Sequence, residues 1–421
     1  MNGLTISSIR TTFLARFARR LVSAAVALTL IGGYALGAEN DARMTATSWV
    51  DATTGHRVVL LSRFPKGGSG VLYFHQHALT PAGDKLVFAH AGALYSIDIS
   101  NRQPMGEGTI TRLTDLAAKL LGFAAVSRKR PVVYYVAGDK ILATNIDTLQ
   151  TRTIAQIPGD WDLTGESLAG LSANADDTLI AGANTNGVTA IFKSVKDAGG
   201  KRGQQIAQAY EAHLPTLVFT VDIATGKLTV IHRGNDWFNH VQFSPTDPAT
   251  LMFAHEGPWN KVERIWNIRA DGTGLTDVCP RGTDREYRGH EFWSPSGQTI
   301  WFDYFDGKAR MLTGHPLSGG HDTSYPIVGD QYSVHYNISH DGSFFAADGD
   351  GGNKHPMIHL LYPQTDGTLR TEPLCDLTGH NFVRAEPNVS LSADNKWVFF
   401  MANWTGMNQV YAVSVDREPS H

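Results

Sequence analysis

Hydrophobic and polar positions along this chain follow a repeated phrase: a short apolar stretch, a polar turn, and a stretch rich in β-branched and aromatic residues. Seven copies align on a Ser or Thr of the turn, at Thr80, Ser127, Ser172, Ser244, Ser294, Ser339 and Ser392. The intervals between them are 47, 45, 72, 50, 45 and 53 residues. A third stretch, such as "RIWNIRA", usually follows. Short strands at this period are typical of a β-propeller, so the pattern predicts an all-β fold with seven blades.

Two departures from the repeat have simple interpretations. The 72-residue interval leaves room for an insertion at about 193–212, a polar segment that we expect to be helical and to extend from blade three. The segment 48–62 precedes the first phrase without a turn partner, so we expect it to add an outer strand to the last blade and close the ring. A single propeller then accounts for residues 39–421. An α/β fold is excluded because long helical periodicity is nearly absent.

The first 38 residues differ from the rest. An apolar run at 21–36 is preceded by four arginines, and no acidic residue occurs before Glu39. This is the pattern of a secretory signal peptide, which predicts a periplasmic or secreted protein. The run is shorter than the roughly 20 residues of a membrane span, so we expect no stable membrane insertion after cleavage. A retained signal anchor is the alternative.

Charge and cysteine content narrow the function further. The formal net charge is −4, and it becomes −8 without the four leader arginines. A nucleic-acid-binding surface is therefore not expected, and an anionic ligand would need a local basic cluster. Cys279 and Cys375 could form one disulfide or remain two buried thiols, and neither belongs to a metal-type cysteine cluster. The sequence does not indicate an oligomeric state.

Polar residues recur at one position of the repeat. Four residues before each turn Ser or Thr stand, in blade order, Gln76, Phe123, Leu168, His240, His290, His335 and Asn388. The phrase strand is the innermost of its blade, so these positions should ring the central channel. Alternation along a strand adds Arg288 and Glu386 to the same face. A lone His at a strand start is usually structural, but three in phase beside Arg and Glu favour a functional cluster.

A second local feature is the segment "FAHEGPWNKVERIW" at 253–266. Its Gly-Pro pair predicts a turn between two strands of blade four, which places His255 and Glu256 at the end of one strand and Arg264 at the start of the next. Arg264 would then lie near the rim, one blade from His290. The alternative is a surface arginine that pairs with Glu263.

These motifs resemble the oligogalacturonate lyase family of seven-bladed propellers. The matching segments cover most of the mature chain and include "YFHQHALTPAGDK", "VDIATGKLTVIHRGNDWFNHV", "HEGPWNKVERIW", "HEFWSPSG", "HYNISHDGS" and "NWTGMNQVYAVSV". The resemblance implies that His290 is the Brønsted base and that Arg264 helps to neutralise the substrate carboxylate. It further implies a divalent ion, typically Mn²⁺, held by His335 and by a Gln-x-x-His-x-His run at the start of blade seven.

That last run departs from the family pattern. It reads "VRAEPN" here, with Val383, Glu386 and Asn388 at the three ligand positions. Carboxylate and amide oxygens can still hold Mn²⁺, Ca²⁺ or Mg²⁺, so His335, Glu386 and Asn388, with Gln76 as a further candidate, form the expected metal site. Alternatively the metal is lost and Arg288 or Arg384 supplies positive charge.

The reaction that the resemblance implies is β-elimination across C4–C5 of a uronic acid residue in a short oligosaccharide. His240, Arg288, His255 and Gln76 are the expected substrate contacts. Two other functions stay open: a lyase on a different uronate-containing glycan, which the altered metal run suggests, and a non-catalytic envelope propeller of the TolB type that binds glycan or protein. Release of an unsaturated product distinguishes the last from the lyases.

Overall fold

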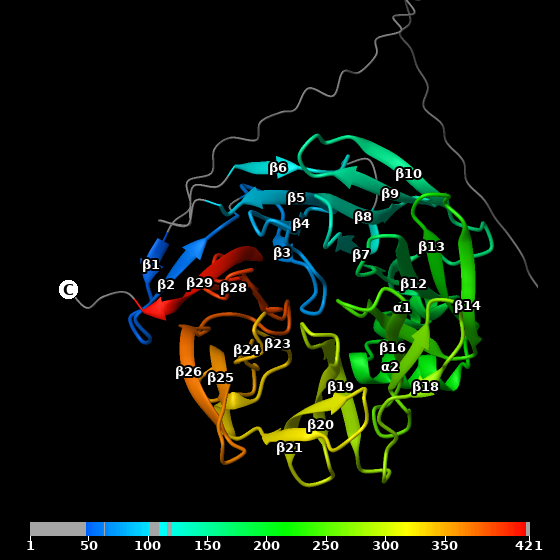
Figure 1. The fold of residues 1–421 in the computed structure, drawn as a ribbon. Helices are drawn as coiled ribbons and strands as arrows, with labels where there is room; N and C mark the ends of the chain where they lie inside the picture. Colours follow the sequence, from blue (N-terminus) through cyan, green and yellow to red (C-terminus); the bar gives the residue numbers. More distant parts are fainter. Residues whose placement is uncertain (1–47, 63, 101–108, 116–119, 418–421) are drawn as a thin grey trace, which may run out of the picture. The chain divides into compact units, whose positions relative to one another are not determined.

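The computed structural model describes residues 48–417 except residue 63 and the segments 101–108 and 116–119. The described strands form seven antiparallel sheets arranged as the blades of a propeller (Figure 1), which confirms the expected all-β fold. The expected signal peptide lies outside the described residues. No helix in the described part of the chain has the length and apolar character needed to cross a membrane.

The blades follow chain order except at the closure. The strands of blades one to three are β3 (Ser69–Val71), β4 (Lys85–His90), β5 (Ala93–Asp98), β6 (Ile110–Arg112), β7 (Leu120–Val126), β8 (Val132–Ala137), β9 (Lys140–Asn145), β10 (Thr151–Gln156), β11 (Leu168–Ala173), β12 (Leu179–Thr185), β13 (Thr216–Asp222) and β14 (Leu228–Gly234). Those of blades four and five are β15 (Trp237–Phe243), β16 (Thr250–Glu256), β17 (Ile265–Arg269), β18 (Thr276–Asp277), β19 (Tyr287–Trp293), β20 (Thr299–Phe305), β21 (Arg310–Pro316) and β22 (Thr323–Pro326). Those of blades six and seven are β23 (Tyr336–Ile338), β24 (Phe345–Ala347), β25 (Met357–Pro363), β26 (Leu369–Asp376), β27 (Ser390–Leu391), β28 (Trp397–Ala402), β29 (Gln409–Arg417), β2 (His56–Leu60) and β1 (Ser48–Val50). Two short 3₁₀ turns lie at Gly165–Ser167 and Gly329–Gln331.

The last blade combines the two ends of the described chain. Strand β2 pairs antiparallel with β29, with Val58 opposite Val413 and Leu60 opposite Tyr411. The segment 48–62 therefore closes the ring as expected, but it supplies two strands, because β1 pairs in turn with β2. The N-terminal strands β1 and β2 thus form the outer part of blade seven, and the C-terminal strands β29, β28 and β27 form the rest, with β27 innermost.

The insertion in blade three is helical. Helices α1 (Val188–Asp197) and α2 (Arg202–Glu211) lie between β12 and β13, so the insertion begins five residues earlier than the expected 193. Val188, Phe192 and Val195 are buried on one face of α1, at the spacing of a helix that packs on one side. The Phe192 ring meets the Trp237 ring edge-on, with centroids 5.0 Å apart, and this contact holds the helices against blade four.

The repeated Ser of the turn has a structural reason. In blades five, six and seven its hydroxyl oxygen accepts a backbone N–H from the start of the next strand: Ser294 from Thr299, Ser339 from Ser343 and Ser392 from Lys396. These bonds satisfy turn N–H groups that the ladder leaves unpaired. The sequence phrase thus marks the point where each inner strand turns into the second strand of its blade.

The inner strands are irregular at the repeated polar position. The ladder between β15 and β16 shifts register between Asn239 and Gln242, and the ladder between β19 and β20 shifts between Gly289 and Phe292. His240, His290 and Asn388 all have positive φ, at 49°, 46° and 55°. Bulges of this kind redirect a side chain, and they break the alternation on which a simple strand pattern depends.

Both cysteines are free thiols. Cys279 follows β18 and is half-buried, whereas Cys375 lies in β26 and is buried. The structure therefore has no disulfide between them. Burial raises the pKa of both thiols, so they remain protonated at neutral pH.

Candidate functional site

The three histidines that recur in the sequence repeat converge in the structure. The rings of His290 and His335 meet edge-on with centroids 4.9 Å apart. The Tyr73 ring lies 5.3 Å from the ring of His240 and 5.1 Å from that of His335. Tyr73 thus joins residues of blades four and six, and His335 brings in His290 of blade five, although these residues are far apart in the chain.

Tyr73 belongs to a segment that leaves blade one and enters the channel. The chain departs after β3 and returns at Leu79, which pairs with Leu86 of β4; Figure 1 shows this blue segment running into the middle of the ring. The backbone of Phe74 is held from blades six and seven. Its N–H donates to Asn388 Oδ1 at 3.3 Å, and its carbonyl accepts from Asn337 Nδ2 at 2.7 Å. The channel-crossing segment, residues 72–79, therefore separates two sides of the channel.

His290 is paired with a carboxylate. Its Nδ1 lies 3.1 Å from Asp303 Oδ1, and Asp303 is on β20, the strand next to β19. The His290 side chain is 15% exposed, so this ring remains accessible. Burial lowers the pKa of His290, but the negative charge of Asp303 and the hydrogen bond to it outweigh that effect and raise the pKa above its ordinary value of 6.5. The pair fixes the ring and leaves Nε2 to face a ligand.

Gly289 makes room for this pair. A Cβ at this position would lie 2.9 Å from Asp303 Oδ1 and 3.2 Å from Trp259 Cη2, closer than side-chain carbons normally approach. The Trp259 ring in turn meets the His290 ring edge-on at 5.4 Å. The glycine before the histidine therefore lets a carboxylate and an indole pack against the backbone of β19.

His240 belongs to a buried charge network. Its Nδ1 lies 2.7 Å from Glu291 Oε1. Arg264 donates from Nε to Glu291 Oε2 at 2.9 Å and from Nη1 to Glu256 Oε2 at 2.9 Å. The Glu291 side chain is fully buried and Arg264 is only 2% exposed. Burial raises the pKa of Glu291, but the charges of Arg264 and His240 outweigh this effect and hold that pKa well below its usual range. The Glu291 carboxylate is therefore ionised.

Arg264 lies beside His240, one blade from His290, but it is buried rather than exposed at the rim. Glu263 pairs with Arg281 instead, at 3.3 Å, so the alternative of a surface pair with Glu263 is wrong. Burial lowers the pKa of Arg264, but Glu256 and Glu291 outweigh this and raise it above the ordinary value. The guanidinium is charged, and two carboxylates already compensate that charge.

His335 has a carboxylate partner of its own. Its Nδ1 lies 2.8 Å from Asp348 Oδ2, and its backbone N–H donates to Asp348 Oδ1 at 2.8 Å. On the other side of the ring, Nε2 lies 3.2 Å from the Tyr73 hydroxyl and 3.6 Å from Glu386 Oε2. A carboxylate behind a histidine fixes its tautomer and presents Nε2 as a ligand. Two of the three expected metal ligands, His335 and Glu386, therefore face each other.

The third expected ligand, Asn388, has another role. Its Oδ1 accepts the Phe74 N–H and its Nδ2 donates to the carbonyl of Glu386 at 2.9 Å. Both ends of the amide thus hold backbone, and Asn388 supports the channel-crossing segment instead of facing His335. Val383 is 98% exposed and contributes no ligand atom.

The structure does not bring Arg288, His255 or Gln76 to the histidine cluster. Arg288 donates to the Pro280 carbonyl at 3.0 Å and lies over the Tyr304 ring, because the bulge at Gly289 turns it away from the face of His290. His255 pairs with Asp236, at 3.3 Å, and Gln76 lines a cavity on the other side of the crossing segment. These three expected substrate contacts therefore lie outside the histidine cluster.

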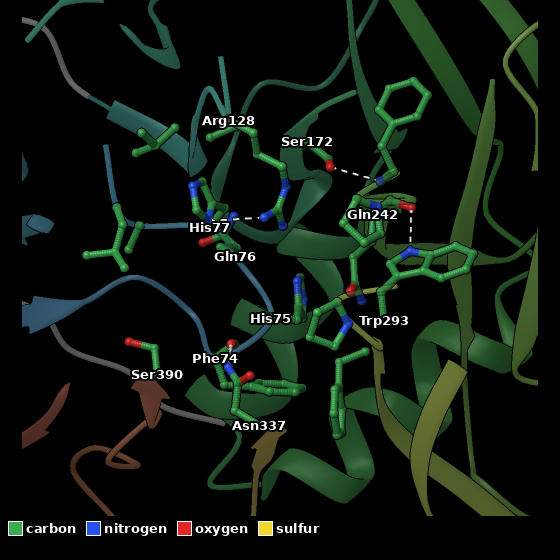
Figure 2. Close-up of a pocket in the computed structure, with 18 of the residues that line it drawn as sticks. Phe74, His75, Gln76, His77, Arg128, Ser172, Gln242, Trp293, Asn337 and Ser390 are labelled. Carbon is green, nitrogen blue, oxygen red and sulfur yellow. Dashed lines mark hydrogen bonds between the residues drawn. The ribbon is translucent and has the colours of Figure 1, made fainter. Parts of the chain in front are cut away.

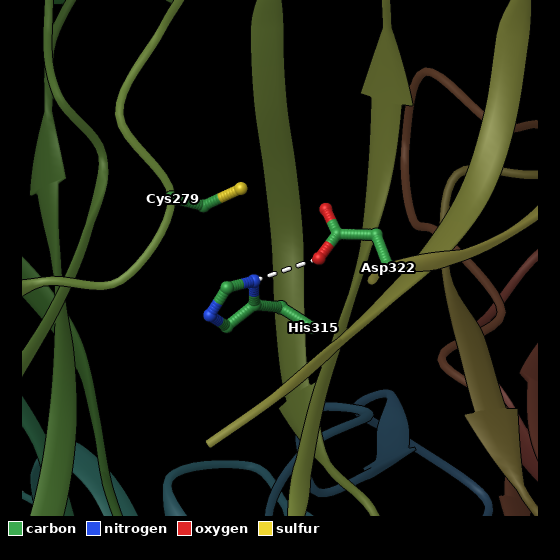
Figure 3. A group of neighbouring side chains, drawn as sticks. All are labelled: Cys279, His315 and Asp322. Carbon is green, nitrogen blue, oxygen red and sulfur yellow. Dashed lines mark hydrogen bonds and ion pairs between the residues drawn. The ribbon is translucent and has the colours of Figure 1, made fainter. Parts of the chain in front are cut away.

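A different set of ligand-type side chains lies away from the channel. Cys279, His315 and Asp322 place their ligand atoms within 4.8 Å of one another, and His315 Nδ1 lies 2.8 Å from Asp322 Oδ1 (Figure 3). This group could not be predicted from the repeat pattern, because its members come from β21 and from two loops. It does not contact His290 or His335 through any described hydrogen bond or ion pair.

Comparisons with known proteins agree with this architecture. A family model described as oligogalacturonate lyase matches residues 38–351. An oligogalacturonide lyase of Pectobacterium atrosepticum is 26% identical over 89% of this chain and 97% of its own length. An oligogalacturonate lyase of Dickeya dadantii is 25% identical over 87% of this chain and 95% of its own. A solved oligogalacturonate lyase in complex with manganese superposes with a TM-score of 0.74 and 24% identity, covering 89% of this chain and 97% of the other.

Proposed function

The chain belongs to the oligogalacturonate lyase family, and on that premise we propose that it cleaves short oligogalacturonides by β-elimination, with His290 as the base. The observation that carries this assignment is the pair of His290 and Asp303, which holds one accessible imidazole at the edge of a polar cluster. The pair supports the proposal because a base needs a fixed tautomer and an open nitrogen.

The chemistry sets clear demands on the site. The C5 proton of a uronate is weakly acidic because the neighbouring carboxylate is already an anion. A base must remove that proton while the electrons form the C4–C5 double bond and the glycosidic oxygen leaves C4. Positive charge near the carboxylate stabilises the negative charge that develops in the transition state.

His290 is suited to take the proton. Nδ1 faces Asp303, so Nε2 carries the lone pair when the ring is neutral, and the imidazolium that forms after proton transfer is stabilised by the same carboxylate. Trp259 lies edge-on against the ring at 5.4 Å and restricts its rotation. We therefore expect the substrate to bind with C5 next to Nε2.

A divalent cation would be held by His335 and Glu386, whose ligand atoms lie 3.6 Å apart. The donor set fits a cation that accepts nitrogen and carboxylate oxygen, such as Mn²⁺, and a related structure contains manganese. When bound, the ion supplies positive charge to the uronate carboxylate. Asp348 orients His335 toward it, and the Tyr73 hydroxyl would give up its contact with Nε2.

Arg264 is the second source of positive charge. Because Glu256 and Glu291 compensate it, its effect on a substrate carboxylate is weaker than that of an unpaired guanidinium. Its direct structural task is to hold Glu291, which positions His240 behind the Tyr73 ring. We propose that His240 and Arg264 shape the floor of the site.

We place the mature protein in the periplasm or outside the cell, because the basic and apolar leader pattern is that of an exported protein. Oligogalacturonides that enter the envelope are then its substrates. The net charge of −8 that remains after cleavage makes the local histidine cluster and its cation the means of attracting such anions.

A substrate panel tests the proposed function. Purified protein loaded with Mn²⁺ is incubated with short oligomers of galacturonate, glucuronate and mannuronate, and the absorbance of the 4,5-unsaturated product is followed. We expect product from the galacturonate oligomers. Product only from another uronate would support the second lyase reading, which the Glu386 and Asn388 replacements motivate, and no product from any of them would favour a binding propeller.

A further inference from the structure

A polar cavity of about 240 Å³ lies on the other side of the channel-crossing segment from His290. Its walls come from the later halves of the inner strands, among them Val241–Phe243 and Phe292–Ser294, and from residues 74–79. His290, Asp303 and His335 do not line it. The cavity is therefore distinct from the proposed active site, but the crossing segment borders both, and its His75 ring lies 5.1 Å from the His240 ring.

The cavity contains a cation without an anion. Arg128 is the only lysine or arginine among the described residues that line it, and none of those residues is an aspartate or glutamate. The Arg128 guanidinium has one described contact, from Nη1 to His77 Nδ1 at 3.3 Å (Figure 2). No described carboxylate lies within ion-pair distance of Arg128, whereas Arg130 in the same turn is paired with Asp177.

The lack of a described carboxylate beside Arg128 has an energetic consequence. Burial lowers the pKa of the Arg128 guanidinium to about 10, so it still carries its charge at neutral pH. The Arg128 side chain is half-buried, and taking an uncompensated charge partly out of water is costly, so proteins usually pair such groups. A chain with a net charge of −4 has many carboxylates to offer, yet none is described beside this guanidinium.

Neutral polar side chains line the same space. Burial lowers the pKa of His75 and of His77 well below 6.5, and for His77 the Arg128 charge adds to this effect. Both rings are therefore neutral near pH 7. His75 Nε2 and Gln76 Nε2 are buried and have no described hydrogen-bond partner. Because Arg128 donates to Nδ1 of His77, that ring carries its proton on Nε2, and its hydrogen bond to the Leu79 backbone uses that proton.

We propose that this cavity binds a small oxyanion, a carboxylate or inorganic phosphate, through Arg128, with the Gln76 amide as a neutral donor. A guanidinium fork matches the two oxygens of such a ligand. The volume is below the roughly 300–1,000 Å³ of pockets that enclose drug-sized ligands, so a sugar chain is excluded and a small anion fits. Figure 2 shows Arg128 and His77 side by side, with Gln76 next to them.

The test measures anion binding and uses no catalytic readout, so its outcome is independent of the lyase assignment. The melting temperature of the wild type, Arg128→Met and Arg130→Met is measured with increasing phosphate, or acetate, against sodium chloride at equal ionic strength. The wild type should show a saturable rise with at least one of the two anions, and the anion that gives it identifies the ligand type. Arg130→Met, which removes a paired arginine of the same turn, should keep the rise.

Arg128→Met should bind the anion about ten- to a hundredfold more weakly, as expected for the loss of charge-assisted hydrogen bonds. Without anion it should melt at the same temperature as the wild type or higher, because an uncompensated charge has been removed. If Arg128→Met does not fold, Arg128→Gln and calorimetric titration of the wild type replace it. The proposal is overturned if the wild type shows neither a saturable shift nor binding heat with phosphate and acetate, or if the Arg128 variants respond as the wild type does.

Discussion

His290 Nδ1 lies 3.1 Å from Asp303 Oδ1, and the two residues are separated by 13 positions in the chain. The same relationship recurs in the next blade, where His335 Nδ1 lies 2.8 Å from Asp348 Oδ2, again 13 positions apart. His290 lies within the inner strand β19 and Asp303 on the second strand β20, whereas His335 directly precedes the inner strand β23 and Asp348 directly follows the second strand β24. One structural device thus supports two proposed chemical tasks: a base in blade five and a metal ligand in blade six.

The Asp303 charge should set the pH dependence of catalysis. Since Asp303 raises the pKa of His290 above 6.5, and since the base must be neutral, kcat/KM should rise with pH through an apparent pKa above 6.5. Asp303→Asn should lower that apparent pKa, moving the rising limb to lower pH, and should reduce kcat by roughly ten- to a thousandfold because the ring is no longer oriented. The measurement is the pH profile of product formation.

Asp322→Asn is the matched control for that profile. It removes the partner of His315, in a His–Asp pair outside the channel. It should leave both kcat and the rising limb of the pH profile unchanged. A rising limb that stays in place in Asp303→Asn would remove Asp303 from the role of orienting the base.

Gly289 should be sensitive to a single methyl group. In Gly289→Ala the new Cβ would meet Asp303 Oδ1 at 2.9 Å, so the carboxylate or Trp259 has to move. We expect kcat to fall by about tenfold or more, because small displacements of catalytic groups are costly, while the melting temperature changes little. Gly159→Ala, where an added Cβ meets nothing within 4 Å, should keep full activity. Equal activity of the two variants would show that the close packing at Gly289 is dispensable.

The metal site can be located by metal content. Elemental analysis after dialysis against Mn²⁺ should show one ion per wild-type chain, and His335→Ala or Glu386→Ala should lose it. His315→Ala, in the Cys279 group outside the channel, should retain it. If His315→Ala loses the ion and His335→Ala keeps it, the cation belongs to the group in Figure 3.

Arg264 should matter for stability before it matters for chemistry. Arg264→Met leaves Glu256 and Glu291 buried without their partner, and breaking a buried ion pair costs about 3–5 kcal/mol. Urea unfolding should show a loss of this size, and the variant should also lose activity. Arg281→Met, which breaks the more exposed pair with Glu263, should cost less than about 1 kcal/mol. Equal stability of both variants would contradict the buried network.

Much of the fold could be predicted because it depends on local pattern. Six turn serines and one threonine mark seven hairpins, and the unpartnered segment at 48–62 indicated the closure in which β2 pairs with β29. The common position of His240, His290 and His335 in the repeat predicted their convergence, since equivalent residues of successive blades face one axis.

The remaining features of the site could not be predicted, because the alternation of polar and apolar residues along a strand does not encode them. A bulge at Gly289 turns Arg288 toward Pro280 and away from His290. The crossing segment that places Tyr73 among the histidines reads in the sequence as an ordinary inner strand. Asp303 and Asp348 were missed because they lie on or directly after the second strand, although their common spacing of 13 residues from a histidine in successive repeats was a readable signal. The burial of Arg264 depends on Glu291, which follows the base in sequence but faces the other way.

The most direct measurement is product formation by His290→Ala with short oligogalacturonides. Wild-type protein should generate the ultraviolet absorbance of the 4,5-unsaturated product, whereas His290→Ala should generate none above background. The variant should also melt at the wild-type temperature and retain its bound metal. A folded, metal-loaded His290→Ala that works within a few-fold of wild type would contradict the assignment of His290 as the base.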